Sequence, residues 1–220
     1  MTRIALGREF IRDVDRACCA ALEEIGFQRF GGIPRKQLTD DAMGWVGLNT
    51  ATSYGDGTMG VNPVIGVIFE PVERLIYEIE WRLSEKKMHP TISRNVGYAS
   101  PEKTYWEFKF VKGEPIIPRA KEVAEAVRLY GLPWMRRHCT MEPLMKVLLP
   151  RTKSEDSVER LLAAYILQGR SREEIEQYMA ERLETLTREI NGKRVVNQRV
   201  QTFFVKARAW MDQRDPHRSD

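Results

Sequence analysis

Residues 43–69 read MGWVGLNTATSYGDGTMGVNPVIGVIF, and this stretch decides the fold. It holds six of the chain's 15 glycines, and apolar residues lie on both sides of the turn sequence Tyr54–Gly57. Glycine supplies positive φ angles at a turn and lets neighbouring backbone pack closely. We therefore expect two strands, Trp45–Thr52 and Gly60–Phe69, joined by a hairpin turn. The stretch lacks the Gly-Lys-Ser/Thr ending of a phosphate-binding loop, and no helix is expected directly behind the turn.

Further elements are expected on both sides of this hairpin. Apolar residues recur at helical spacing over 10–25, with Gly26 at the position of a C-terminal cap. The segment Phe27–Leu38 predicts a strand interrupted by Gly31-Gly32, with Pro34 at an edge or a bulge. A helix is expected from Pro71 to about Glu85. The alternating residues 104–111 predict a half-buried strand, and 86–103 a loop or a poorly marked strand.

Beyond Pro118 the sequence predicts only helices. They are expected over 119–130, 133–138 and 141–149, followed by a helical hairpin in which Gly169 ends the first arm. Ser171 and Glu174 form a capping box that opens the second arm. The final helix carries the strongest amphipathic pattern, from Val196 to Met211.

Strands thus gather early in the chain and helices late, which predicts an α+β fold. We expect a mostly antiparallel sheet packed by helices, followed by a helical C-terminal section. The expected division is an α+β domain over residues 1–115 and a helical section over 116–220, which could dock into one compact domain.

Composition limits the class of protein. With 42% hydrophobic and 30% charged residues in 220, the chain is typical of globular proteins. Its notable apolar run, 63–69, is far shorter than the roughly 20 residues of a membrane-spanning helix. No signal-peptide core is visible, and we read the three cysteines as reduced. We therefore expect a cytoplasmic protein without a membrane partner.

Chemical motifs are weak. The histidines are His89, His138 and His217, and neither HxH nor HExxH occurs. The pair His138-Cys139 lacks further zinc ligands, and adjacent helical residues point about 100° apart, which makes them poor partners in catalysis. We expect no catalytic residue, no metal and no cofactor. One functional alternative is nevertheless an enzyme. Its site would assemble from distant residues, such as Asp56, His89 or His138.

Two groups of polar residues are candidates for binding a partner. The first lies around the expected hairpin turn, where a rigid scaffold presents side chains: Asn49, Tyr54 and Asp56, with Asn62 nearby. The second is a basic segment, Arg188–Arg208, with six cations and one acid: Arg188, Lys193, Arg194, Arg199, Lys206 and Arg208. It could meet phosphates or an acidic protein surface, and a solvated helix face is the plain alternative.

Several segments resemble a bacterial family that carries only a domain-of-unknown-function label. They are AALEEIGF (20–27), GWVGLN (44–49), NPVIGVIF (62–69), LLAAYILQGRSREEIEQYM (161–179) and FFVKARAWM (203–211). The resemblance implies a small α+β bacterial protein and supplies no catalytic residues.

We therefore expect a non-enzymatic bacterial interaction protein that binds a protein partner. An accessory or immunity-type role in a toxin or phage-defence locus follows only from the character of that family. The alternative is a nucleic-acid-binding module that uses the basic C-terminal patch.

Overall fold

The computed structural model describes residues 6–52, 57–80, 89–151, 155–190, 193–195 and 197–214. For residues 151, 155, 188–190 and 193–195 it describes the backbone alone. The chain forms two compact units. The first unit combines Met1–Ile68 with Ile92–Thr140, and the second combines Phe69–Thr91 with Met141–Asp220.

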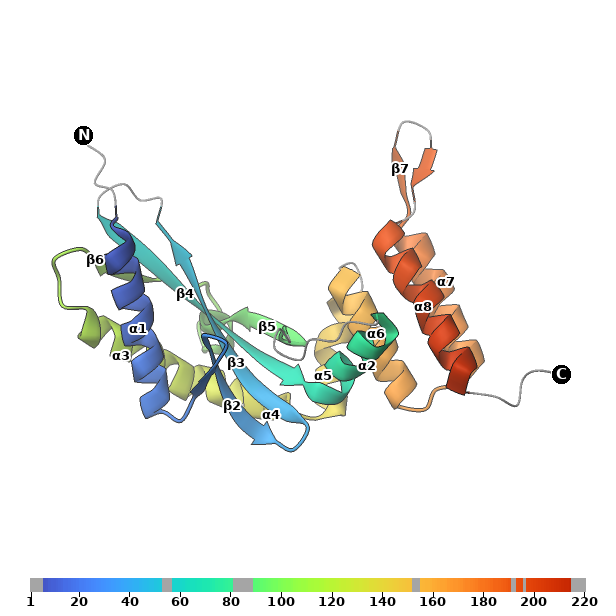
Figure 1. Cartoon of the computed structure of the whole chain (residues 1–220), viewed down its shortest axis with the longest axis horizontal. Coiled ribbons are helices and arrows are strands. Elements are labelled where there is room, and N and C mark those ends of the chain that lie inside the picture. Colours follow the sequence, from blue (N-terminus) through green and yellow to red (C-terminus); the bar gives the residue numbers. More distant parts are fainter. Residues whose placement is uncertain are drawn as a thin grey trace. The chain divides into compact units, whose positions relative to one another are not determined.

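The first unit is built on an antiparallel sheet, which confirms the expected α+β fold (Figure 1). Its strands are β1 (Gln28–Phe30), β2 (Ile33–Thr39), β3 (Ala42–Ala51), β4 (Thr58–Phe69), β5 (Ile92–Asn95) and β6 (Phe108–Val111). They follow the order β1-β2-β3-β4-β5, and β6 also pairs with β4. The long central strand pairs with β6 over Thr58–Val61 and with β5 over Val64–Val67. Its proline, Pro63, lies between these two registers, where it interrupts neither ladder.

The first two strands form a tight hairpin rather than one broken strand. Phe30 pairs with Ile33, and the two residues between them, Gly31 and Gly32, have φ angles of 58° and 87°. Two successive positive φ angles are the mark of a type I′ turn, which glycine adopts without strain. The expected edge position of Pro34 is wrong, because β2 lies between β1 and β3. The β2–β3 register begins one residue later, at Arg35, so no ladder hydrogen bond is lost.

Helices cover one face of this sheet. They are α1 (Arg8–Glu24), α3 (Ile116–Ala126), a π-helical turn η3 (Val127–Gly131) and α4 (Leu132–Arg137). A Cβ added at Gly131 would lie 3.0 Å from Ile65 of β4, and one at Gly44 of β3 would lie 2.8 Å from Met135 of α4. The helical layer and the sheet therefore approach each other closely at two glycines, Gly131 of η3 and Gly44 of β3. The buried stripe of α1, which includes Val14, confirms the expected amphipathic helix.

Two predictions for the segment before α3 need correction. The 86–103 region contains a strand, β5, and a short 3-10 helix, η2 (Val96–Ala99). The expected strand over 104–111 shortens to β6, because the side chain of Asn95 takes the place of a strand partner beside Trp106. Its Nδ2 donates to the Trp106 carbonyl, and its Oδ1 accepts from the Trp106 amide, each at 2.9 Å.

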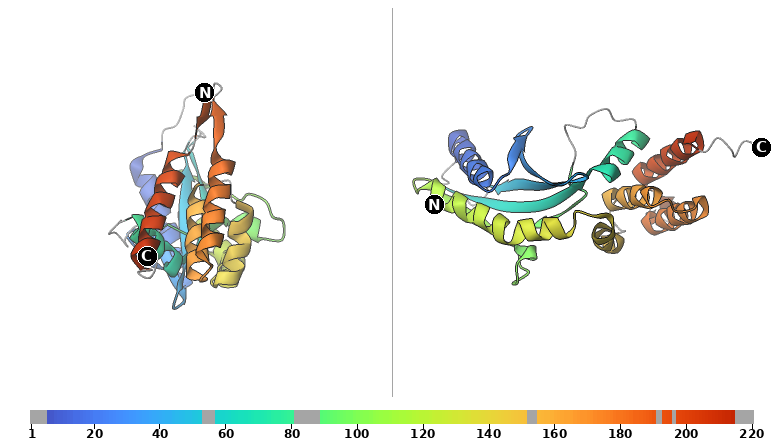
Figure 2. Two further views of the ribbon diagram at one scale, coloured as in Figure 1. Left: turned by 90° about the vertical axis from the view of Figure 1, so that its right-hand side faces the viewer. Right: turned by 90° about the horizontal axis from the view of Figure 1, so that it is seen from below.

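The second unit is a helical cluster. It contains α2 (Glu70–Glu80), α5 (Met141–Leu148), η4 (Leu149–Arg151), α6 (Glu155–Leu167), α7 (Arg172–Leu186) and α8 (Gln198–Arg214). Helices α6, α7 and α8 lie side by side (Figure 2). The predicted capping box is present, since Ser171 and Glu174 exchange hydrogen bonds, and Gly169 has the positive φ of a helix end.

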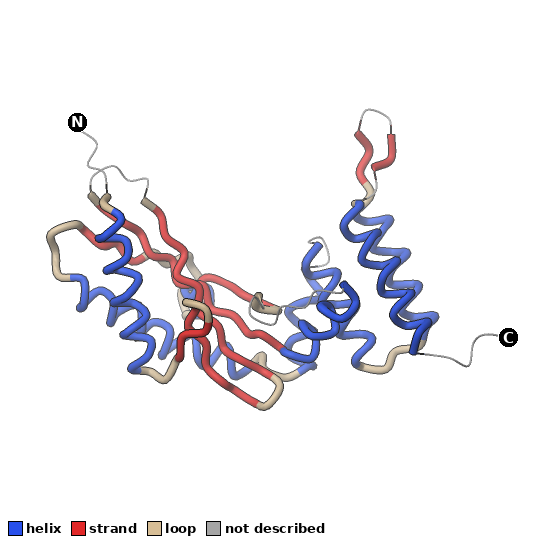
Figure 3. Tube along the Cα trace, in the orientation of Figure 1, coloured by secondary structure: helices blue, strands red, loops and turns tan. Residues whose placement is uncertain are grey.

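The statement that no strand follows Pro118 is wrong. Strands β7 (Arg188–Ile190) and β8 (Lys193–Val195) form a short antiparallel pair between α7 and α8 (Figure 3). Each strand has only three residues, too few to show a period of two in the sequence.

The compact units do not follow the division expected at residues 115 and 116. Helix α3 packs on α1 and β6, and so belongs with the sheet. Helix α2 packs on α6 and α8, and so belongs with the C-terminal helices, although it follows β4 in the sequence. Among the described helices, none is long and apolar enough to cross a membrane.

Candidate functional site

The first unit has an open groove of about 710 Å³ beside α3, which we call the α3 groove. One wall is the segment 105–108, which leads into β6, and the other is formed by α3 and η3. Four aromatic side chains, from Tyr105, Trp106, Phe108 and Tyr130, line it. A hollow of this size is typical of a binding site.

Apolar side chains lie open to solvent in the α3 groove. Tyr105 is 56% exposed and Leu129 is 45% exposed. The rings of Trp106 and Tyr130 meet edge to face, with their centres 5.4 Å apart. Aromatic rings packed in this way are held in place by each other, so they offer a partner a pre-formed surface.

Local structure determines the positions of these aromatic rings. Asn95 fixes the backbone of Trp106 through two hydrogen bonds, and the indole packs against Gly97, where an added Cβ would lie 2.6 Å from its Cγ. On the other wall, the π-helical turn adds a residue to the helical turn at Leu129 and Tyr130. Such turns are frequent at functional sites in proteins.

Two pairs of opposite charges lie at the rim of the α3 groove. Arg119 hydrogen-bonds Glu122, and Arg128 donates to both carboxylate oxygens of Glu125, at 2.6 and 2.7 Å. The Arg128 hydrogen bond lowers the pKa of Glu125, which keeps that carboxylate ionised. The rim therefore presents ion pairs instead of a field of one sign.

The residues predicted around the central hairpin do not form a described site. Asn49 is exposed near the end of β3, as expected. Tyr54 and Asp56 lie outside the described residues. Asn62 is buried within β4, at 7% exposure, and so does not belong to an exposed cluster.

The predicted basic segment is partly neutralised by acids from other helices. The backbone places Arg188 on β7, and Lys193 and Arg194 on β8. Arg199 of α8 lies 2.7 Å from a carboxylate oxygen of Asp156 and 3.0 Å from one of Glu159.

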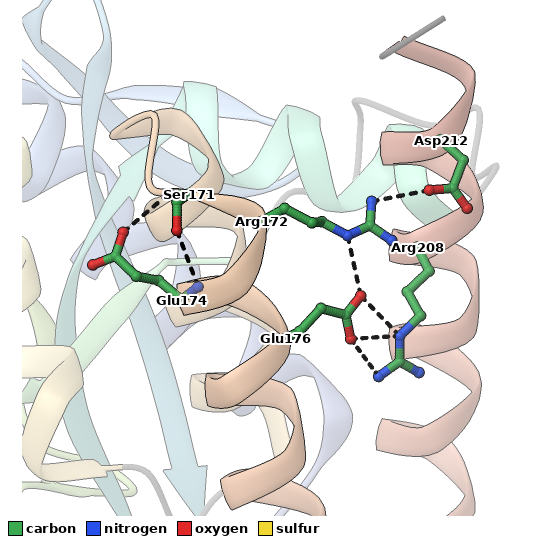
Figure 4. A network of polar contacts seen from close by, with 6 residues as sticks. All are labelled: Ser171, Arg172, Glu174, Glu176, Arg208 and Asp212. Carbon is green, nitrogen blue, oxygen red and sulfur yellow. Dashed lines mark hydrogen bonds and ion pairs between the residues drawn. The ribbon is translucent and has the colours of Figure 1, made fainter. Parts of the chain in front are cut away.

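Arg208 of α8 is likewise paired with an acid. It contacts the Glu176 carboxylate of α7 at 2.8 Å, within the network shown in Figure 4. The hydrogen bond from Arg208 is the main reason that the pKa of Glu176 is lowered. Counting charges within the 188–208 window missed these acids, which lie 32 and 40 residues from their partners.

The side chains of the predicted pair His138-Cys139 each contact a backbone carbonyl. His138 Nδ1 lies 2.7 Å from the Trp134 carbonyl, and Cys139 donates to the Arg136 carbonyl at 2.9 Å. Burial is the main cause that lowers the pKa of His138. His89 is exposed. Within the described ranges, no three His, Cys, Asp or Glu side chains gather as metal ligands would.

Sequence reasoning missed the α3 groove, although one signal was present. The segment 104–110 carries four aromatic residues, and in the half-buried strand expected here alternation places Trp106, Phe108 and Phe110 on one face. Only Phe110 is fully buried. Comparison of the chain with models of protein families, with curated proteins and with solved structures gave no match in any of the three.

Proposed function

We propose that this chain is a non-enzymatic protein that binds another protein, and that the α3 groove receives an apolar, largely uncharged segment of that partner. The observation that carries the proposal is the exposure of Tyr105 and Leu129 in a hollow with ordered aromatic walls. Monomeric soluble proteins rarely leave sizeable apolar patches open, and those that do use them for interaction.

The expected strength supports binding of a protein segment. Covering a tyrosine or leucine side chain removes apolar area from water, which contributes a binding free energy of roughly 25 cal/mol per Å². Anchors of this kind, each contributing about 1–2 kcal/mol or more, carry much of the affinity at protein interfaces. The paired charges on the rim add specificity without attracting a polyanion.

Nucleic acid remains the alternative partner, through the basic segment Arg188–Arg208. Binding of a phosphate backbone relies on cations that can release counterions. Both Arg199 and Arg208 already face carboxylates, which favours the protein partner over the nucleic acid. An accessory or immunity-type role in a bacterial toxin or phage-defence locus stays a prediction, and it would make the partner a toxin or a defence component.

The test is affinity capture from the native host with three baits. The wild-type chain should recover a partner protein in stoichiometric amount. The variant Tyr105→Glu/Leu129→Glu should lose it, because two charges replace the apolar anchors. Val205→Glu is the matched control, since Val205 is 58% exposed on α8 of the second unit, and it should keep the partner.

Two results would contradict the proposal. One is recovery of the same protein, in the same amount, by the wild type and the groove variant. The other is recovery of nuclease-sensitive material whose binding falls steeply with salt and survives the groove substitutions. That second result would favour the nucleic-acid alternative.

A further inference from the structure

A second apolar groove lies between α3 and α1. It measures about 500 Å³ and is lined at its centre by Ala17, Ala20 and Ala21 of α1 and by Ile117 of α3. Ile117 is 64% exposed, the highest value among the exposed large hydrophobic side chains of the described residues. We call this hollow the α1 groove.

The α1 groove is bordered by four charged residues, Asp13, Arg16, Glu24 and Lys121, and two of them are placed symmetrically. Arg16 and Glu24 lie four residues before and four residues after Ala20, which places all three on one side of the helix. Arg16 is 74% exposed and its nearest acid, Asp13, is 3.6 Å away. Glu24 is 64% exposed and lies 4.0 Å from Lys121. Exposed pairs at such distances are weak and can exchange partners at little cost.

This arrangement is complementary to itself. If two copies of α1 cross antiparallel with Ala20 on the two-fold axis, residue 16 of one copy lies opposite residue 24 of the other. Each Arg16 then meets a Glu24 of the second copy, twice in the assembly. Such reciprocity is the property that a two-fold interface requires.

The shape of the surface fits the same assembly. Alanines at the centre of the contact let two helices approach closely, toward the short end of the usual range of about 8–10 Å. Ile117, which lines the groove, then gains an apolar partner across the axis. The dimer would bury the Ile117 side chains of both copies, and this burial stabilises the contact in addition to the two Arg16–Glu24 pairs.

We propose that the chain forms a two-fold homodimer through antiparallel contact of its α1 helices at the α1 groove. The occupant of this groove is thus a second copy of the chain. The inference goes beyond the proposed function, because the α3 groove, which shares only Lys121 with the α1 groove, is left for another protein.

Sedimentation velocity over a range of concentrations tests the proposal. The wild-type chain should reach a mass twice 25.6 kDa. Arg16→Glu and Glu24→Arg should each raise the dissociation constant of the dimer by about tenfold or more, because each creates two like-charge contacts. Combining the two substitutions restores opposite charges, so the dissociation constant of the dimer should return to within about threefold of the wild-type value.

Cross-linking gives a second, independent readout. Ala20→Cys places a thiol next to the two-fold axis, so oxidation should form a disulfide between residue 20 of one copy and residue 20 of the other. Asp15→Cys is the matched control, since residue 15 is exposed and points about 140° away from residue 20 on the helix. The native Cys18 and Cys19 will not interfere, because burial raises their pKa values to about 12 and about 11.

Three outcomes would overturn the proposal. They are a wild-type chain that stays monomeric at every concentration, equal cross-linking at positions 15 and 20, or a double charge reversal that fails to restore association. Tyr105→Glu/Leu129→Glu should leave the dimer unchanged, and a loss of the dimer in that variant would place the contact at the α3 groove instead.

Discussion

Replacing Arg160 by methionine should destabilise the second unit by about 3–5 kcal/mol, because it leaves a buried carboxylate without its partner. Arg160 of α6 donates through Nε to Glu73 of α2 at 2.8 Å. The side chains are only 15% and 6% exposed, so water cannot replace the lost contact. Methionine keeps most of the volume of arginine, so the cost of an empty cavity stays small.

A double-mutant cycle separates the ion pair from packing. Glu73→Leu/Arg160→Met removes both charges and should cost far less than Arg160→Met alone, since no charge is left buried. Urea unfolding followed by far-UV circular dichroism measures the free energy of unfolding of each variant. A loss below about 1 kcal/mol for Arg160→Met would mean that the Arg160–Glu73 pair behaves as an exposed pair does. It would also contradict the assignment of α2 to the C-terminal helices, which this contact supports.

The remaining predictions concern the groove wall and two carboxylates. Gly97→Ala should destabilise the first unit and weaken partner binding, because the added Cβ would lie 2.2 Å from the Thr104 carbonyl oxygen; thermal unfolding and affinity capture measure both effects. The pKa of Glu176 is lowered, chiefly by Arg208, so its stabilisation is complete above its unfolded pKa and is lost as pH falls through the folded value. Glu176→Gln should therefore reduce the loss of stability on acidification, as measured by urea unfolding at several pH values between neutral and acidic. The pKa of Glu159 is raised, chiefly by burial, so stability falls as pH rises through that raised value. Glu159→Gln should flatten that fall, and an unchanged pH profile would contradict it.

Local patterns predicted features of both units. The spacing of apolar residues in α1 and the capping box at Ser171 depend on nearby residues, and both appear as expected. Gly31 and Gly32 were expected to interrupt one strand, and instead they form the turn between β1 and β2. Strand β5 was unclear because it has four residues and gains its stability by pairing with β4, almost 30 positions earlier. Sequence periodicity carries no signal for such a pairing.

The sites depended even more on contacts between distant residues. The α3 groove exists because Asn95 holds Trp106, 11 residues later, and because a π-helical turn presents Leu129. The basic segment seemed uncompensated because the acids that pair with Arg199 lie on α6. Neither fact can be found in a window of neighbouring residues.

The most direct test of the proposed function is site-specific photo-cross-linking in the native host, with a photoreactive amino acid at position 129. We predict a covalent adduct with one partner protein at position 129 and none with the same probe at position 205. Adducts of equal yield at both positions, or none at position 129, would contradict the claim that the α3 groove binds a protein.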